Sequence, residues 1–338
     1  RSFNQGDTWE AISPDLTQGG KEGNVAYGTI TTISESPFQF GLLYAGSDDG
    51  LVHVTKDGGS TWQKISDSFP KDLWVSRVVA SSHQKERVYV TLNGYRWDDF
   101  TVYVYVSEDY GKTWKNSSEG ISKAPVNVIR EDSVNPNILY VGTDNGLYIS
   151  FNRGLKWQPF MNGLPPVAVH DLALQTEAQD LIVGTHGRSI YKVNLKAIQQ
   201  LSDTVLNQDL KVFEVDKINY SENWGSNWSK WLAAYEPERV VDYYVKKEGP
   251  VQIQVINEAG IVVFEDTQNA VSGINQWSYK VEASKSGVER WTKKDKKVVL
   301  KPAKNNKTYL IPGKYQIKLT QGSVSQQTTL EITKDERK

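Results

Sequence analysis

The sequence predicts an all-β protein, in which about four blades' worth of β-propeller strands precede a β-sandwich. Two observations predict the propeller: a short turn motif ending in tryptophan recurs four times within residues 1–157, and about four short strands fit between copies. The tryptophans lie 53, 52 and 43 residues apart, which is the period of a propeller blade. A third observation, the alternation of apolar and polar residues after residue 240, predicts the sandwich.

The turn motif reads [S/T]-x-[D/N]-x-G-x-[T/K]-W and occupies residues 2–9, 55–62, 107–114 and 150–157. Its Asp or Asn can accept hydrogen bonds from backbone N–H groups one or two residues on. Its Gly can adopt a positive φ, and the Trp that follows is a large packing anchor. We therefore expect structural turns at Asn4, Trp9, Asp57, Gly59, Trp62, Asp109, Gly111, Trp114, Asn152, Gly154 and Trp157.

A second motif repeats with the same period. It has the pattern of a strand, a tight polar turn and another strand, and it occupies residues 43–51, 139–147 and 181–190. The two motifs together give four strands per repeat. In the second repeat we predict these strands at residues 74–80, 87–91, 101–107 and 113–116.

The number of strands bears on how the propeller closes. Residues 8–13 are predicted to form one outer strand, three four-strand blades follow, and the last strands are at 169–175, 181–185 and 189–194. These 16 strands could close as a ring of four blades. We instead expect the C-terminal part of a larger propeller, with its other blades upstream or on another chain, because a hairpin that lacks one arm leaves an unpaired edge.

The remaining sequence divides into a linker and a second domain. We predict a propeller domain at 1–195, a linker at 196–239 and a sandwich of about seven strands at 240–338. The linker has room for a short helix within 195–207, and then an irregular segment that contains Trp224, Trp228 and Trp231. The lysine-rich run at 293–297 is predicted to be a solvated loop.

The motifs resemble those of known families. The four turns resemble the Asp-boxes, or BNR-type repeats, of sialidases, xyloglucanase-type glycoside hydrolases and sortilin-type receptors, over about residues 1–195. Residues 273–279 and 312–319 resemble patterns of the flagellar-hook-capping type of immunoglobulin-like domain. The combination is similar to exported bacterial proteins described as sortilin-like or glycosyl-hydrolase-like repeat proteins. This resemblance implies export to the periplasm, the cell surface or the extracellular space.

Composition excludes several kinds of site. The chain has 39 basic and 40 acidic residues, a formal net charge of −1, which argues against a protein that coats nucleic acid. It has no cysteine, so a thiol nucleophile, a disulfide and a cysteine-bound metal are excluded. The four histidines show no metal-like spacing, and we expect no metal or other cofactor. No apolar run is long enough for a transmembrane helix.

Candidate binding residues lie in an insertion. Ser107 follows Tyr89 by 18 positions, whereas Thr55 follows Tyr44 by 11 and Ser150 follows Tyr140 by 10. Insertions in repeat folds form loops that often lie on a binding face. The alternative is a loop that packs on its neighbour. The candidate residues of this loop are Tyr95, Arg96, Trp97, Asp98 and Asp99.

A second candidate is the polar turn that contains His186 and Arg188. We predict no second histidine or carboxylate beside His186, so a structural turn is the alternative. The inter-strand turns also supply acids that a glycosidase would need in a facing pair: Asp48, Asp49, Asp98, Asp99 and Asp144. The catalytic residues, if there are any, stay unknown from the sequence.

Two functions remain open at this point. The first is a binding or scaffold module for glycan or protein ligands. The second is a glycoside hydrolase of the sialidase or xyloglucanase type, with its catalytic acids largely in N-terminal blades outside this sequence. A pair of acids facing one cleft would favour the hydrolase, and a cleft of aromatic and amide side chains would favour binding.

Overall fold

The computed structural model describes residues 1–19, 27–229 and 231–334. The chain forms two compact units, Arg1–Gln199 and Gln200–Lys338. Strands make up most of the regular structure of both units, and the few helices are short. The predicted all-β class is therefore confirmed.

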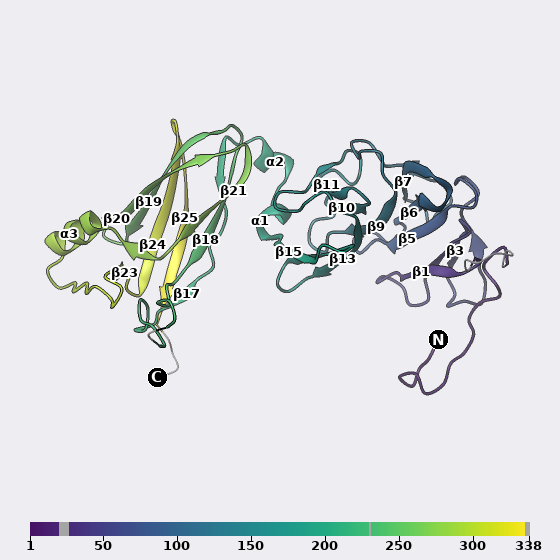
Figure 1. Ribbon diagram of the computed structural model, residues 1–338, viewed down its shortest axis with the longest axis horizontal. Helices are drawn as coiled ribbons and strands as arrows, with labels where there is room; N and C mark the ends of the chain where they lie inside the picture. Colours follow the sequence, from purple (N-terminus) through teal and green to yellow (C-terminus); the bar gives the residue numbers. More distant parts are fainter. Residues whose placement is uncertain (20–26, 230, 335–338) are drawn as a thin grey trace. The chain divides into compact units, whose positions relative to one another are not determined.

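The first unit is a partial β-propeller built from four antiparallel sheets in chain order (Figure 1). Each sheet consists of strands that follow one another in sequence, and the innermost strands of successive sheets lie side by side in the order β1, β5, β9, β13. The first two sheets contain β1 (Ile30–Glu35), β2 (Leu43–Ser47), β3 (Val52–Thr55), β4 (Gln63–Lys64), β5 (Trp74–Ala80), β6 (Val88–Gly94), β7 (Asp99–Ser107) and β8 (Lys115–Asn116).

The third and fourth sheets continue the arrangement. They contain β9 (Val126–Glu131), β10 (Leu139–Thr143), β11 (Gly146–Ser150), β12 (Gln158–Pro159), β13 (Val169–Gln175), β14 (Asp180–Thr185) and β15 (Ile190–Asn194). The predicted three-stranded final sheet is confirmed. The predicted outer strand at residues 8–13 is wrong, because the first strand of the described residues is β1 and this segment forms none. It is held instead by two backbone hydrogen bonds between Arg1 and Glu10, of 2.6 and 2.8 Å.

All four turn motifs form the same hydrogen bonds. In the third copy, the Ser107 hydroxyl donates to Asp109 and accepts the Gly111 N–H, each at 2.7 Å. Asp109 also accepts the Thr113 N–H at 2.9 Å. The Asp side chain therefore accepts the N–H of the residue four positions later, whereas we expected an N–H one or two positions later. The same bond is made by Asn4, Asp57 and Asn152 in the other copies.

The tryptophans of the third and fourth motifs connect neighbouring sheets. The indole N–H of Trp114 donates to the Ile65 carbonyl at 2.8 Å, and that of Trp157 donates to the Ser117 carbonyl at 2.7 Å. Trp62 makes the equivalent bond to Ile12. Trp157 is 2 % exposed, whereas Trp9 in the first copy is 77 % exposed. In the third and fourth copies, the motif therefore anchors one sheet on the preceding one.

The second unit is a β-sandwich of a three-stranded and a five-stranded sheet. One hydrophobic core lies between them, with Tyr243 and Trp277 from one sheet and Ile253 and Ile317 from the other. The strands are β16 (Leu210–Val212), β17 (Ile218–Asn219), β18 (Arg239–Val245), β19 (Gly249–Asn257), β20 (Val262–Ala270), β21 (Gly273–Tyr279), β24 (Gly313–Gln321) and β25 (Val324–Thr333), with β22 (Glu282–Ala283) and β23 (Thr308–Tyr309) as a separate pair.

The segment between β15 and β18 is largely irregular, but β16 and β17 within it join the two sheets of the sandwich. Residues 195–207 contain two helical turns, α1 (Lys196–Gln199) and α2 (Asp203–Leu206). Trp224 is buried in the sandwich core, where it contacts Tyr220 and Tyr309. Trp228 and Trp231 are exposed. The tryptophans therefore do not share one environment.

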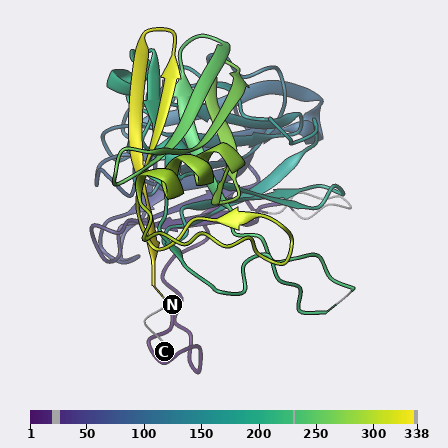
Figure 2. The same ribbon diagram turned by 90° about the vertical axis from the view of Figure 1, so that its left-hand side faces the viewer.

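Helix α3 (Lys285–Lys294) is the longest helix and packs on β20 (Figure 2). Ser284 caps the first turn of the helix by accepting the Gly287 N–H. Trp291, a residue of the helix, is buried. The predicted solvated loop at 293–297 is therefore wrong for Lys293 and Lys294, which form the last helical turn. An apolar residue that anchors the helix every turn lets this lysine-rich sequence be helical.

Candidate functional site

A cavity of about 410 Å³ lies on the first unit. Residues from three neighbouring sheets line it, so no single blade contains the site. The second sheet contributes aromatic, amide and cationic groups, the third an amide and a carboxylate, and the fourth two imidazoles. The lining residues are Trp74, Asn93, Tyr95, Arg96, Asn127, Asp144, Ala168, His170 and His186.

The predicted insertion supplies three of these residues, Asn93, Tyr95 and Arg96. It forms a long β6–β7 hairpin whose tip is a single 3-10 turn, η1 (Tyr95–Trp97). Asn93 accepts the Tyr95 N–H through its side chain at 2.9 Å and so begins the turn. Asp98 ends it in the left-handed conformation, with φ of 53°. Tyr95 is 62 % exposed and presents its ring to solvent at the cavity.

The other insertion residues lie outside the cavity lining. The Trp97 indole donates to the Asp72 carbonyl at 2.9 Å and ties the tip to the loop that precedes β5. Asp99 accepts the Thr101 N–H and the Tyr103 hydroxyl. Hydrogen bonding by the Thr101 side chain, with further bonds from the Thr101 N–H and Tyr103, lowers the pKa of Asp99. Asp99 therefore favours its charged form and is a poor proton donor.

Arg96 is held in place from two sides. Its guanidinium lies 5.3 Å from the centroid of the Trp74 ring, within the range of a cation–π contact. One guanidinium nitrogen also lies 3.6 Å from a carboxylate oxygen of Asp48, whose side chain is almost fully buried. Asp48 itself is fixed by the Thr29 N–H. The arginine therefore approaches the cavity in a defined position while its side chain stays 43 % exposed.

A chain of hydrogen-bonded amides crosses the cavity wall. The Asn93 side chain donates to Asn127 at 2.8 Å, and Asn127 donates to Asp144 at 2.8 Å and to the Val169 carbonyl at 3.2 Å. The three side chains come from three turns or strands of two sheets. Because each orients the next, the polar groups of the wall are fixed before any ligand arrives.

A histidine pair forms the opposite part of the lining. The rings of His170 and His186 lie 5.2 Å apart between centroids, tilted by 31°. The prediction that no second histidine lies beside His186 is therefore wrong, because adjacent strands β13 and β14 bring together residues 16 positions apart. Arg188, in the same turn as His186, is exposed and lies outside the cavity lining. No group of three or more metal-ligating side chains occurs among the described residues.

The predicted acids do not form a pair in the cavity. Asp144 is the one carboxylate among the described lining residues. Asp49 is buried and is held by two hydrogen bonds. It accepts the Ser47 hydroxyl, and it accepts the Gln18 N–H at 2.6 Å. Asp48 is engaged by Arg96, as described above.

Sequence reasoning missed Trp74, Asn127 and His170. A weak signal existed for Asn127, which is a polar residue within the apolar stretch that forms β9. Trp74 opens an inner strand and His170 follows the start of another. All three residues lie at the beginning of an inner strand. The packing of the sheets, which the sequence does not show, brings these three positions to one cavity.

One family model matches much of the sequence. A family model described as "Sortilin, neurotensin receptor 3" (Sortilin-Vps10) matches residues 102–338. Similar solved structures include a xyloglucanase of family GH74 from Xanthomonas campestris, with 11 % identity, a TM-score of 0.41 and coverage of 90 % of this chain and 47 % of that one.

Two further structures have comparable similarity. A GH74 enzyme from Niastella koreensis has 12 % identity and a TM-score of 0.41, with 76 % of this chain and 39 % of that one covered. The computationally designed Ika4 protein has 12 % identity and a TM-score of 0.39, with 55 % and 99 % covered. The chain thus spans less than half the length of these two glycoside hydrolases.

Other comparisons add little. The search of curated proteins finds no match. Within the residues that the structure describes, no helix has the length and apolar character needed to cross a membrane. The family model covers more than two thirds of the sequence, including the last propeller strands and the sandwich, and the chain belongs to the Sortilin-Vps10 family.

Proposed function

We propose that the first unit is a binding module, which holds a glycan or protein ligand in the cavity formed by its second, third and fourth sheets. One observation carries this proposal: the lining combines fixed aromatic, amide and cationic side chains with a single carboxylate. Such a set can stack against a ring and hydrogen-bond to hydroxyl or carbonyl groups. Among the described lining residues, it lacks the second acid that glycoside hydrolysis requires.

Each group of the lining has a distinct part in this proposal. Tyr95 offers an exposed ring face, and Arg96 offers guanidinium donors that Trp74 and Asp48 hold in position. The amides of Asn93 and Asn127 orient one another and leave the wall polar. A ligand therefore meets a rigid surface, which reduces the entropy lost on binding.

Arrays of glycans and of peptides, probed with the full chain, test the proposal. We compare the wild type with Tyr95→Ala and Arg96→Ala, and use Arg188→Ala as the matched control, because Arg188 is an exposed arginine outside the lining. We expect Arg96→Ala to weaken binding about tenfold or more and Arg188→Ala to leave it unchanged. Equal losses for both arginines would contradict the assignment of the cavity.

Hydrolysis is the competing outcome. Catalytic acids in blades outside this sequence would allow it, as the resemblance of the repeats implies. With xyloglucan and sialyllactose as substrates, the proposal predicts no release of new reducing ends or of sialic acid by this chain. If reducing ends or sialic acid were released, and the release depended on Asp144, the first unit would be an enzyme rather than a binding module.

The proposal also covers the identity of the repeats, the type of the second unit and the location of the protein. The identical side-chain bonds of all four turns support their assignment as Asp-boxes, and the two packed sheets support an immunoglobulin-like second unit. Export of the protein, and a role at the cell surface or in the periplasm, follow from the resemblance of these motifs. Fractionation of the producing cells, with detection by antibody, tests the location.

A further inference from the structure

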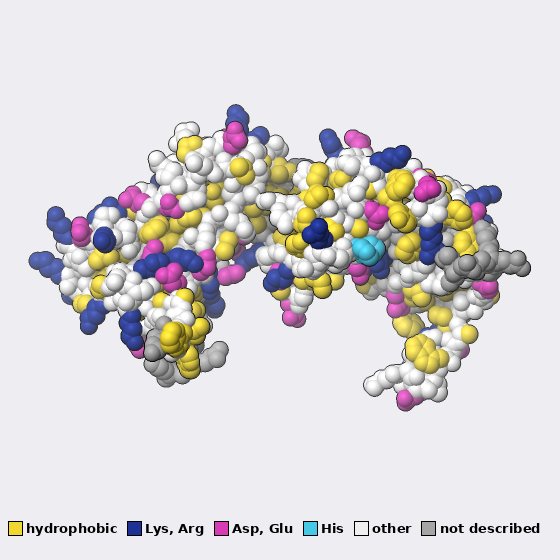
Figure 3. Space-filling model, in the orientation of Figure 1, with side chains coloured by type: hydrophobic (Ala, Val, Ile, Leu, Met, Phe, Trp, Pro, Cys, Tyr) yellow, Lys and Arg dark blue, Asp and Glu magenta, His cyan; other side chains and the backbone are white. Residues whose placement is uncertain are grey.

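A strongly basic segment lies on the second unit. Residues 285–307 contain nine lysines and arginines and two carboxylates, Glu289 and Asp295, although the formal net charge of the whole chain is −1. Figure 3 shows lysine and arginine side chains gathered at the end of the second unit that carries α3. Such a concentration of one charge in a balanced protein creates a local positive potential.

Much of this charge is unpaired. Lys307 forms ion pairs with Glu236 and Glu282, and Arg290 forms one with Glu265. The remaining exposed lysines form no side-chain hydrogen bond or ion pair with the residues that the structure describes, apart from Lys294, which donates to the Ala259 carbonyl. The unpaired lysines are Lys285, Lys293, Lys296, Lys297, Lys301 and Lys304.

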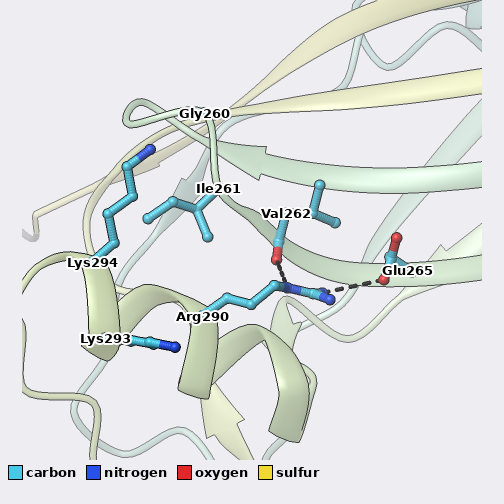
Figure 4. Close-up of a pocket in the computed structure, with 7 residues that line it drawn as sticks. All are labelled: Gly260, Ile261, Val262, Glu265, Arg290, Lys293 and Lys294. Carbon is cyan, nitrogen blue, oxygen red and sulfur yellow. Dashed lines mark hydrogen bonds and ion pairs between the residues drawn. The ribbon is translucent and has the colours of Figure 1, made fainter.

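A cavity of about 570 Å³ lies at the centre of this segment. The turn between β19 and β20 and the start of β20 form one wall, and three cations of α3 form the other: Arg290, Lys293 and Lys294 (Figure 4). Spacings of three and four residues place these cations on one side of the helix. The apolar residues Ile261 and Val262 also line the cavity.

Arg290 is positioned in the cavity by its neighbours. Its Nε donates to the Val262 carbonyl at 3.0 Å, and Nη2 donates to Glu265 at 3.2 Å, as Figure 4 shows. Its other terminal nitrogen, Nη1, forms no hydrogen bond or ion pair with a described residue. A fixed guanidinium with a remaining donor suits a carboxylate or sulfate group.

Helix stability explains only part of the charge. Lys293 and Lys294 lie in the last turn of α3, where cations interact favourably with the helix dipole. Lys296, Lys297, Lys301 and Lys304 lie beyond the helix and have no such role. A purely structural origin of the basic segment therefore leaves most of its lysines unexplained.

We propose that the α3 segment, residues 285–304, is a docking surface for an acidic polysaccharide, with carboxylate or sulfate groups at the Arg290 cavity and along the lysines that follow. The apolar residues of the cavity suit the CH faces of a sugar ring. This surface is on the second unit and is independent of the cavity proposed for the first.

Two other polyanions fit less well. A membrane surface is disfavoured because the apolar face of α3 is turned inward, with Trp291 buried, and Val299 is the one large apolar side chain exposed in the described segment 285–307. Single-stranded nucleic acid is disfavoured because no exposed aromatic side chain of that segment is available to stack on bases.

Affinity electrophoresis of the full chain tests the docking surface, with polygalacturonate as the acidic probe and dextran as the neutral one. The variant Lys293→Gln/Lys296→Gln is compared with Lys246→Gln/Lys247→Gln, a matched pair of exposed lysines elsewhere on the same unit. We expect retardation by polygalacturonate but not by dextran. The first variant should bind about tenfold more weakly, and added salt should weaken the wild type further.

Several outcomes would overturn the proposal. The absence of retardation, equal losses for the two lysine pairs, or equal retardation by dextran would each contradict it. Stronger binding to double-stranded DNA, or to phosphatidylglycerol vesicles, with the same dependence on Lys293 and Lys296 would assign the surface to another class of partner. Arg290→Lys keeps the charge but loses the guanidinium group. An unchanged affinity for this variant would show that the Arg290 cavity does not contribute to binding.

Discussion

At the scale of the residue, one carboxylate or amide holds each of the four turns of the first unit together. Asp109 accepts hydrogen bonds from Ser107, from the Thr113 N–H and from the Thr113 hydroxyl. These bonds, led by that of the Thr113 N–H, lower the pKa of Asp109 to about 2. Asn152 makes the equivalent bonds to Ser150 and Lys156 without a charge, so geometry rather than charge is what the turn requires.

Substitution of Asp109 separates these two contributions. Asp109→Ala removes every acceptor and should destabilise the fold by about 1 kcal/mol, a modest value because the site is exposed to solvent. Asp109→Asn should keep most of that stability. Because the folded pKa lies below the unfolded one, the charge contributes stability above about pH 4 and loses it as the pH falls towards 2.

Urea denaturation of the three proteins between pH 7 and pH 2 measures the effect. The difference in free energy of unfolding between wild type and Asp109→Asn should shrink as the pH falls through this window. A difference that stays constant across it would show that the Asp109 carboxylate makes no pH-dependent contribution.

At the scale of the element, the glycine of the second repeated motif determines how closely blades pack. A Cβ added at Gly142 in β10 would lie 2.6 Å from a methyl carbon of Val169 in β13, and one at Gly46 in β2 would lie 2.5 Å from a methyl carbon of Val75 in β5. Gly184 in β14 occupies the matching position in the last sheet. The nearest atom to a Cβ there is 3.5 Å away.

The glycines give a matched pair of variants. Gly142→Ala should destabilise the first unit by about 1–3 kcal/mol, because a crowded core must shift to admit the methyl group. Gly184→Ala should be neutral within a few tenths of a kcal/mol, because its methyl group has room. Thermal unfolding followed by circular dichroism compares them, and an equal loss at both positions would contradict blade packing as the role of Gly142.

The strands were predictable because the pattern that specifies each strand lies within a few neighbouring residues. Alternation and turn residues within a few positions predicted 74–80 and 169–175 with the observed bounds. The strand at 8–13 failed because a strand also needs a partner, which local sequence does not show. Helix α3 was missed because its lysines hid the pattern of Gly287 and Trp291, which are buried one turn apart.

The candidate site was only partly predictable for a related reason. Tyr95, Arg96 and His186 were found because an insertion and a polar turn are visible in the sequence, and the structure brings all three into one lining. Asn127 and His170 come from the inner strands of the third and fourth sheets. Their proximity arises from the packing of successive blades, which no spacing in the sequence records.

At the scale of the whole molecule, the chain pairs a partial propeller that carries a preformed polar cavity with a sandwich that carries a basic surface. Neither cavity holds two facing carboxylates among its described lining residues. The binding role proposed above rests on the side chains that line these cavities.

Isothermal titration calorimetry tests this claim most directly, because it records binding and turnover in one experiment. The full chain is titrated with the uncharged glycan or peptide that the arrays retain most strongly, in wild-type and Arg96→Ala form. The account predicts saturation at one site per chain, no heat after saturation, and an affinity about tenfold weaker or more for Arg96→Ala. Heat that continues after each injection, or an affinity unchanged by Arg96→Ala, would contradict it.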